Sequence, residues 1–221
     1  MTRKKKPRVP VELARSGALS VALANTAATR RDNRFIGSPW KPAGTTITSY
    51  DELVSWGLKI GALDSGEAEE LRRKASTDAG EAAAVLERAL AMRADLVRIL
   101  NALARNKPMP AGTLEGLNAV LETTPPRRLV ADGDRARWAP YGRSGDLARM
   151  LWPVALSAAE VLTADPRLPV RQCAHRDCTW LFLHGSTHRR IWCDSQICGN
   201  RDRGKRYYKQ SGKPSRIKGG L

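Results

Sequence analysis

The spacing of apolar residues predicts a mostly helical chain. Between residues 79 and 105, apolar side chains recur at intervals of three, four and seven, which is the period of one face of an α-helix. The positions in this stripe are Val85, Leu86, Leu90, Leu96, Val97, Leu100 and Leu103. The pattern predicts a long amphipathic helix that packs one face into a core.

Shorter helices are predicted on both sides of the long one. The stretch "SYDE" is typical of a capping box, because Ser49 and Glu52 can each bind a free backbone N–H of the other, and it predicts a helix over 50–60 that ends at Gly61. An apolar stretch from Val11 to about Thr26 comes first. Further helices are expected to begin at Asp64 or Ser65, at Thr113 with an end near Glu122, and at Ser144, with a kink at Pro153.

Two short hairpins interrupt or follow these helices. The segment "RRLVADGDRARWAP" predicts a hairpin that turns at "DGD", where two aspartates and a glycine suit a turn better than a metal site. Further on, "VRQC" and "WLFL" alternate in the manner of two short strands. The second hairpin lies among the cysteines of the chain, which changes its interpretation below.

The hydrophobic content of 42% can build a core, but the net charge of +16 is unusual and indicates a polyanionic partner. Residues 1–8 hold five basic and no acidic residues, and residues 167–221 hold thirteen basic and three acidic ones. The part between them is nearly neutral. We therefore expect a disordered basic arm over 1–10 and a disordered basic tail over 211–221.

The sequence has no apolar run long enough to span a membrane, so no membrane partner is expected. Glu12 and Arg15 interrupt the stretch that could otherwise be a secretory signal, which predicts a cytoplasmic protein. Thiols stay reduced there, and clustered cysteines then favour metal binding over disulfides. The helical part also lacks histidine and any catalytic motif, so we predict that the protein is not an enzyme.

All four cysteines fall in one short segment, as two pairs. Cys173 and Cys178 are separated by four residues, as are Cys193 and Cys198, with fourteen residues between the pairs. Two such pairs match the tetrahedral thiolate coordination of Zn²⁺, and four cysteines leave no open position for water. We predict one structural zinc ion, which a unit with so small an apolar core needs in order to fold.

Two other interpretations of the cysteines stay open at this point. The four thiols could form two disulfides, or His175 or His188 could replace one thiol as a ligand. The histidines are otherwise expected around the metal site or on the surface, with His184 ending a strand. With the strands before it and a helix expected near Asp194 or Ser195, the segment outlines a treble-clef-like finger.

The predicted fold is therefore mostly α: a helical N-terminal domain with a small hairpin, followed by a small treble-clef-like α+β zinc finger. The helical domain is placed at 11–165 and the finger at 166–210. Beyond the second cysteine pair, "GNRDRGKRYYKQ" continues the last helix, with Arg201, Lys205 and Lys209 at four-residue spacing on one face. Zinc would fix the start of this helix and hence the direction of its charges.

Several stretches carry a resemblance to a known bacterial family. "CGNR" at 198–201, with "LFL" and "RR" before "WC", resembles the CGNR zinc finger, and "LANT" at 23–26 with Trp56 resembles the ABATE domain that precedes that finger. Members are described as stress-induced transcription regulators. The chain departs from the pattern at His184, at Ile191 and in a shorter loop between the cysteine pairs, which could re-aim Arg189 and Arg190.

These observations predict a zinc-dependent protein that binds nucleic acid, with double-stranded DNA as the expected partner. Its helical domain is expected to sense a small-molecule ligand or to form a homodimer. The rival interpretations are an adaptor that binds protein or structured RNA, a nuclease, and a basic helix that is only solvated. The candidate nucleic-acid contacts are Arg189, Arg190, Asn200, Arg201, Arg203, Lys205, Arg206 and Lys209.

Overall fold

The computed structural model describes residues 18–28, 47–140, 146–175, 178–184 and 190–210. The predicted basic arm, the predicted tail, the start of the helical domain, Ser144, His188 and Arg189 lie outside these ranges. The helices are α2 (Leu19–Asn25), α3 (Tyr50–Lys59), α4 (Ser65–Thr77), α5 (Ala79–Ala104), α6 (Glu115–Glu122), α7 (Leu151–Thr163) and α8 (Asn200–Gln210). The strands are β1 (Arg127–Asp132), β2 (Arg135–Pro140), β3 (Val170–Gln172) and β4 (Leu181–Leu183).

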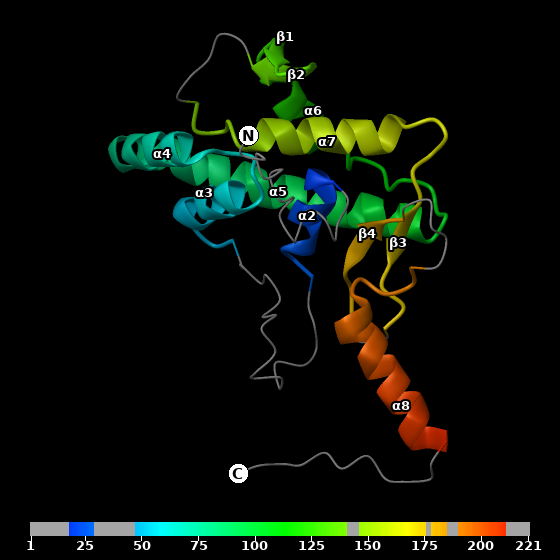
Figure 1. Cartoon of the computed structure of the whole chain (residues 1–221). Helices are drawn as coiled ribbons and strands as arrows, with labels where there is room; N and C mark the ends of the chain where they lie inside the picture. The colour runs from blue at the N-terminus through cyan, green and yellow to red at the C-terminus, as the bar shows by residue number, and fades with distance from the viewer. Residues whose placement is uncertain (1–17, 29–46, 141–145, 176–177, 185–189, 211–221) are drawn as a thin grey trace, which may run out of the picture.

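Helix α5 is the central element of the helical domain. It contacts α2, α3, α4 and α6, while α7 packs on α2 and α6, so that α5 and α7 run as the two long bars of Figure 1. The predicted stripe faces this core: Val85, Leu96 and Leu100 are fully buried. The long amphipathic helix is thus confirmed, and the neighbouring helices pack against its apolar face.

The predicted caps are largely confirmed. Ser49 and Glu52 form the capping box of α3, and Gly61 follows that helix with a φ of 76°, a backbone conformation that favours glycine. Of the two candidates for the next cap, Asp64 is the N-cap of α4 and forms a second capping box with Glu67. These local signals fix the ends of both helices independently of the core.

Two expected helix starts are displaced. Helix α6 begins at Glu115, because the buried Thr113 donates its hydroxyl to the carbonyl of Pro110 instead of capping the helix. Helix α7 begins at Leu151, so Pro153 lies in its first turn and the predicted kink is wrong. Backbone N–H groups of the first turn have no partner inside a helix, and a proline there removes nothing.

The hairpin of β1 and β2 is confirmed as predicted. The strands pair antiparallel from Arg127–Pro140 to Asp132–Arg135, and Gly133 takes the positive φ of 65° in the turn between them. Leu129 and Trp138 are 59% and 58% exposed. The hairpin therefore contributes little to the core and stands above α6 and α7 in Figure 1.

The hairpin of β3 and β4 joins two hydrophobic cores. Val170 and Leu181 pack into the large core of the helical domain, whereas Phe182 packs with the four cysteines in a second, smaller cluster. Neighbouring side chains on a strand point to opposite faces, which is why Leu181 and Phe182 serve different cores. Both predicted strands are confirmed, and they connect the helical domain to the finger that extends from it in Figure 1.

No helix in the described ranges is both long and apolar enough to cross a membrane.

Candidate metal centre and nucleic-acid interface

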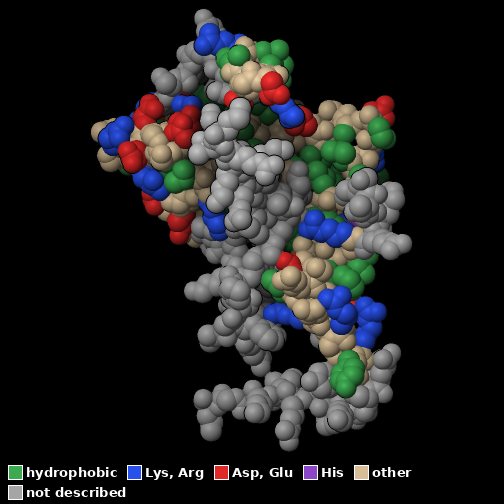
Figure 2. All heavy atoms as spheres, viewed as in Figure 1, with side chains coloured by type: hydrophobic (Ala, Val, Ile, Leu, Met, Phe, Trp, Pro, Cys, Tyr) green, Lys and Arg blue, Asp and Glu red, His purple; other side chains and the backbone are tan. Residues whose placement is uncertain are grey.

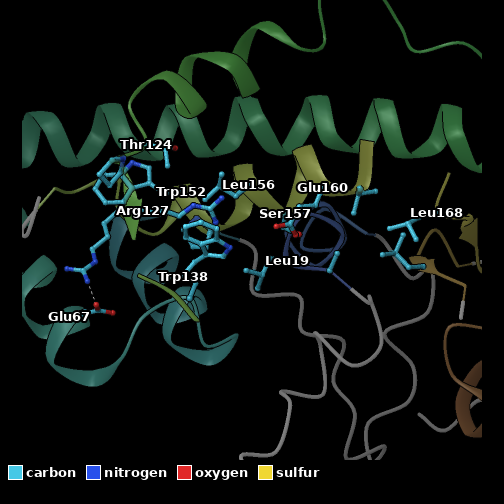
Figure 3. A pocket seen from close by; sticks show the side chains of 17 residues that line it. Leu19, Glu67, Thr124, Arg127, Trp138, Trp152, Leu156, Ser157, Glu160 and Leu168 are labelled. Carbon is cyan, nitrogen blue, oxygen red and sulfur yellow. Dashed lines mark hydrogen bonds and ion pairs between the residues drawn. The ribbon is translucent and has the colours of Figure 1, made fainter. Parts of the chain in front are cut away.

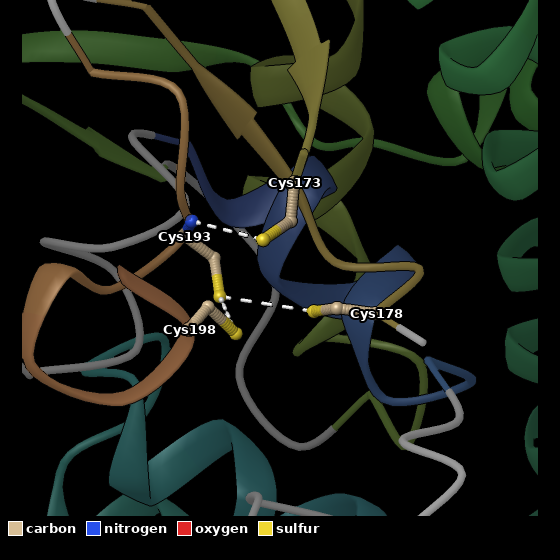
Figure 4. A group of neighbouring side chains, drawn as sticks. All are labelled: Cys173, Cys178, Cys193 and Cys198. Carbon is tan, nitrogen blue, oxygen red and sulfur yellow. Dashed lines mark hydrogen bonds between the residues drawn. The ribbon is translucent and has the colours of Figure 1, made fainter. Parts of the chain in front are cut away.

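The four cysteine sulfurs converge on one point, as Figure 4 shows. All four Sγ atoms lie within 4.8 Å of one another; the Sγ of Cys193 is 3.8 Å from that of Cys178 and 3.6 Å from that of Cys198. A tetrahedral zinc ion with Zn–S bonds of about 2.3 Å requires sulfur–sulfur separations of about 3.8 Å. The cluster has the dimensions of a four-thiolate zinc site.

Neither two disulfides nor His175 as a ligand fits this geometry, while His188 lies outside the described residues. The Sγ atoms of Cys193, Cys178 and Cys198 are much farther apart than the roughly 2.05 Å of a disulfide bond, so these cysteines are not disulfide-bonded. Within the described ranges the cluster contains cysteine alone, so His175 is not a ligand. His175 and His184 are 5% and 6% exposed, which excludes the surface position considered for them.

The close packing of the thiols lowers the pKa of one and raises the pKa of others. Hydrogen bonds from Cys178, Cys193 and Cys198 hold the pKa of Cys173 well below its usual range. The contact with Cys173 and those with the other thiols raise the pKa of Cys193, and the pKa of Cys198 is raised mainly by Cys173 and Cys178. A divalent cation replaces the remaining protons, so zinc affinity at this site falls as the pH falls.

Backbone hydrogen bonds hold both cysteine pairs in place. The N–H of Cys193 donates to the Sγ of Cys173 at 3.4 Å, which ties the second pair to the first. The Asp194 carboxylate accepts from the N–H groups of Gln196 and Ile197 at 2.8 and 2.9 Å and caps the turn Ser195–Gly199. This turn leads directly into α8, so the helix predicted near Asp194 or Ser195 is confirmed.

Two family models match the chain in the order that the fold indicates. Residues 17–165 match ABATE, described as "Putative stress-induced transcription regulator", and residues 170–211 match the CGNR zinc finger. The chain belongs to the ABATE family. No curated protein gives a significant match. The CGNR match agrees with the sulfur geometry, and Cys173, Cys178, Cys193 and Cys198 hold one structural zinc ion.

The glycine of the "CGNR" motif lies against a tryptophan. A Cβ at Gly199 would stand 3.2 Å from Cε3 of Trp192, closer than side chains normally approach, whereas a Cβ at Gly204 would meet nothing within 4 Å. Both glycines are helical, but only the first is enclosed. The motif therefore needs a glycine at 199 to let the zinc-bound turn pack on Trp192.

This difference predicts opposite effects for two alanine substitutions. We expect Gly199→Ala to destabilise the CGNR finger by about 1 kcal/mol through overpacking against Trp192, and Gly204→Ala to stabilise α8 by up to about 1 kcal/mol. Thermal unfolding and the rate of zinc release to a chelator measure both variants. Faster release from Gly204→Ala than from Gly199→Ala would contradict the packing argument.

Arg190 is held inside the CGNR finger. Its guanidinium carbon lies 4.4 Å from the centroid of the Phe182 ring, and its N–H groups donate to the carbonyls of Trp192 and Cys193 at 3.2 and 2.7 Å. These contacts tie β4 to the segment that enters the second cysteine pair. Arg190, predicted to contact nucleic acid, thus has a visible positioning role in the finger.

Two arginines of α8, Arg203 and Arg206, are exposed on the surface of the finger. Arg203 donates to the carbonyl of Ser195 at 3.1 Å and to Oδ1 of Asn200, and its guanidinium carbon is 5.9 Å from the Trp192 ring. Arg206 forms an ion pair with Asp202 one turn earlier. Figure 2 shows Lys and Arg side chains gathered over this helix. The side chains of Lys205 and Lys209 are outside the described part of the chain.

Asn25 positions the finger hairpin, a role that the sequence analysis did not assign to it. Its Nδ2 donates to the carbonyl of Leu181 and its Oδ1 accepts from the N–H of Leu181, both at 2.8 Å. The amide thereby pairs with β4 as a neighbouring strand would. Asn25 lies in "LANT", and an amide at the end of an apolar stretch is the one sequence signal that could have marked it.

Proposed function

We propose that this ABATE-family chain is a DNA-binding transcription regulator in which the zinc ion orients a basic helix toward DNA. The observation that carries the proposal is the position of α8: Cys198 is a zinc ligand, and the helix begins two residues later at Asn200. A rigid start gives the cations of that helix a fixed direction. Double-stranded DNA is the partner whose regular phosphate spacing suits such a helix.

The contact surface combines cations with a polar group near the helix start. Arg201, Arg203, Lys205, Arg206 and Lys209 supply charge, and Asn200 is exposed beside them. The hydrogen bonds of Arg203 to Ser195 and Asn200 hold its guanidinium near the zinc-bound turn. In this proposal Arg190 supports the surface from within the finger, and Arg189, which lies outside the described residues, adds a further positive charge.

Removing single charges tests this surface. We expect Arg201→Ala and Lys205→Ala each to weaken binding to duplex DNA at all sequences and to lower the salt slope by about one, because each phosphate contact releases about one counterion. Fluorescence anisotropy at several salt concentrations measures the slope. A contact to a base edge would instead relax the preference at one position of the site.

The matched control is Arg73→Ala, which removes the same charge from an exposed position on α4, far from the finger in Figure 1. It should leave affinity and salt slope unchanged. An equal loss with Arg73→Ala would mean that total charge, not α8, drives binding. Tighter binding to folded RNA than to duplex DNA at the same salt would favour the adaptor interpretation.

We further propose that the chain has no catalytic activity and works in the cytoplasm. Four thiolates complete the coordination of zinc, so the metal has no position for a reacting water. Buried cysteines that form a metal site instead of disulfides suit a reducing compartment. DNA that stays intact with the protein and Mg²⁺ or Mn²⁺ supports this proposal, and cleavage would favour the nuclease.

The ABATE domain has the regulatory part in this proposal, through a ligand or through self-association. Its core is continuous with the hairpin of the finger, since Val170 and Leu181 pack among the residues of the helical domain. A change in the packing of that domain can therefore reach the finger without a linker between them. Sedimentation of the zinc-loaded chain distinguishes the monomer from the dimer.

A further inference from the structure

The ABATE domain contains a cavity of about 520 Å³ between α7, α2 and the β1–β2 hairpin. This volume lies within the range of small-molecule sites. Most of the wall is apolar, with Leu19, Trp152, Leu156 and Leu168 among the residues that line it. Figure 3 shows these side chains arranged around an elongated space, with Leu168 at one end and Trp138 toward the other.

A buried donor without an acceptor lies in this wall. Trp152 is 3% exposed, and its Nε1–H has no hydrogen-bond partner among the residues that the structure describes. Buried N–H groups nearly always find an acceptor, so an unpaired one beside a cavity indicates that a bound molecule supplies it. The bound molecule must present an acceptor atom there, since Trp Nε1 only donates.

The charges around the cavity favour an anionic group at the end near Trp138. Arg127 lines that end, and its guanidinium carbon lies 5.4 Å from the centroid of the Trp138 ring. The other arginine there, Arg149, is already paired with Glu67. Glu160 lies toward the Leu168 end in Figure 3 and disfavours an anion there. The cavity thus has a positive side chain at the end near Trp138 and a negative one toward Leu168.

We propose that this cavity binds a small organic acid with a largely apolar body. Its hydrocarbon or aromatic part fills the space lined by Leu19, Leu156 and Leu168, while its acidic oxygens accept hydrogen bonds from Trp152 Nε1 and pair with Arg127. Leu183, the last residue of β4, also lines the cavity, so a bound acid touches the strand that enters the zinc finger. The proposed acid site stands independently of the proposed function. Only the idea that a bound acid regulates the finger rests on that function.

The test uses two fluorescent probes with the same rings and the zinc-loaded full chain. 1-Anilinonaphthalene-8-sulfonate carries an acidic group, and N-phenyl-1-naphthylamine lacks it. We expect the sulfonate to bind at one site per chain, about tenfold tighter than the neutral amine, because only the sulfonate forms charge-assisted hydrogen bonds. Energy transfer from tryptophan to the bound probe reports binding within the domain.

Two neighbouring arginines give a matched pair of variants. Arg127→Gln should weaken sulfonate binding about tenfold and leave the amine unchanged, whereas Arg128→Gln, next on the same strand and absent from the cavity wall, should change neither. Trp152→Phe keeps an aromatic ring but removes the N–H donor, so it should also weaken binding of the sulfonate. Arg127 is exposed, so its replacement leaves the fold intact.

Equal binding of the two probes, non-saturable binding, or equal effects of Arg127→Gln and Arg128→Gln would each overturn the proposal. The titrations contain no DNA. Their outcome is therefore separate from that of the DNA-binding tests, and a failure of one proposal leaves the other standing.

Discussion

Replacing Cys193 by serine is expected to abolish zinc binding and to unfold the finger while the helical core remains. Cys193 is the central ligand: its Sγ lies beside those of Cys178 and Cys198, and its N–H donates to Cys173. A structural zinc contributes about 10–16 kcal/mol to coupled folding, and the small finger core cannot replace it. Mass spectrometry under native conditions should show one zinc ion per chain in the original protein and none in the Cys193→Ser variant.

Gln196→Ala is the matched control for this experiment. The side chain of Gln196 is exposed within the same zinc-bound turn, and the structural role of this residue is carried by its backbone N–H, which the substitution keeps. This variant should retain one zinc per chain. A Cys193→Ser chain that still holds zinc as tightly as the original would contradict the four-cysteine site.

The second large effect is expected from Asn25→Leu, which removes the amide that pairs with β4. The substitution leaves the N–H and the carbonyl of Leu181 buried without a partner, and each such group costs about 1–3 kcal/mol. We expect a lower unfolding temperature and a large increase in the rate of hydrogen exchange at the Leu181 amide. Exchange measured by mass spectrometry or NMR locates the effect at the hairpin.

Asn25→Asp and Asn118→Ala complete this test. Aspartate keeps an acceptor for the Leu181 N–H but lacks a donor for the Leu181 carbonyl. Asn25→Asp should therefore weaken mainly the hydrogen bond to that carbonyl. Asn118 is exposed on α6, and its replacement should change stability by less than about 0.5 kcal/mol. Unchanged exchange at Leu181 in Asn25→Leu would show that the amide does not hold the hairpin.

The features that the sequence predicted correctly are those with local causes. The stripe from Val85 to Leu103 sets the long helix, and Ser49 with Glu52 sets a cap within one turn. The spacing of the four cysteines predicts their convergence because each pair lies on a tight turn of the backbone. Each of these signals depends on residues that are close together in the chain.

The features that the sequence did not predict depend on distant contacts. Asn25 meets Leu181 across 156 positions, so its place at the end of an apolar stretch could mark it as unusual but could not reveal its partner. Arg190 looks like one more cation of a basic segment, yet the Phe182 ring and two carbonyls bind it. Pro153 was expected to kink α7 because the preceding residues, which form turns instead, fit a helical pattern equally well.

The central claim is that zinc orients α8 for binding to DNA. Its most direct test is an anisotropy titration of duplex DNA at several salt concentrations, with the chain zinc-loaded, stripped by a chelator, and reloaded. The account predicts salt-dependent binding by the loaded chain, loss of most of that affinity on stripping, and recovery with added Zn²⁺. Binding that is equally strong without zinc, or a zinc-loaded chain that does not bind DNA at low salt, would contradict it.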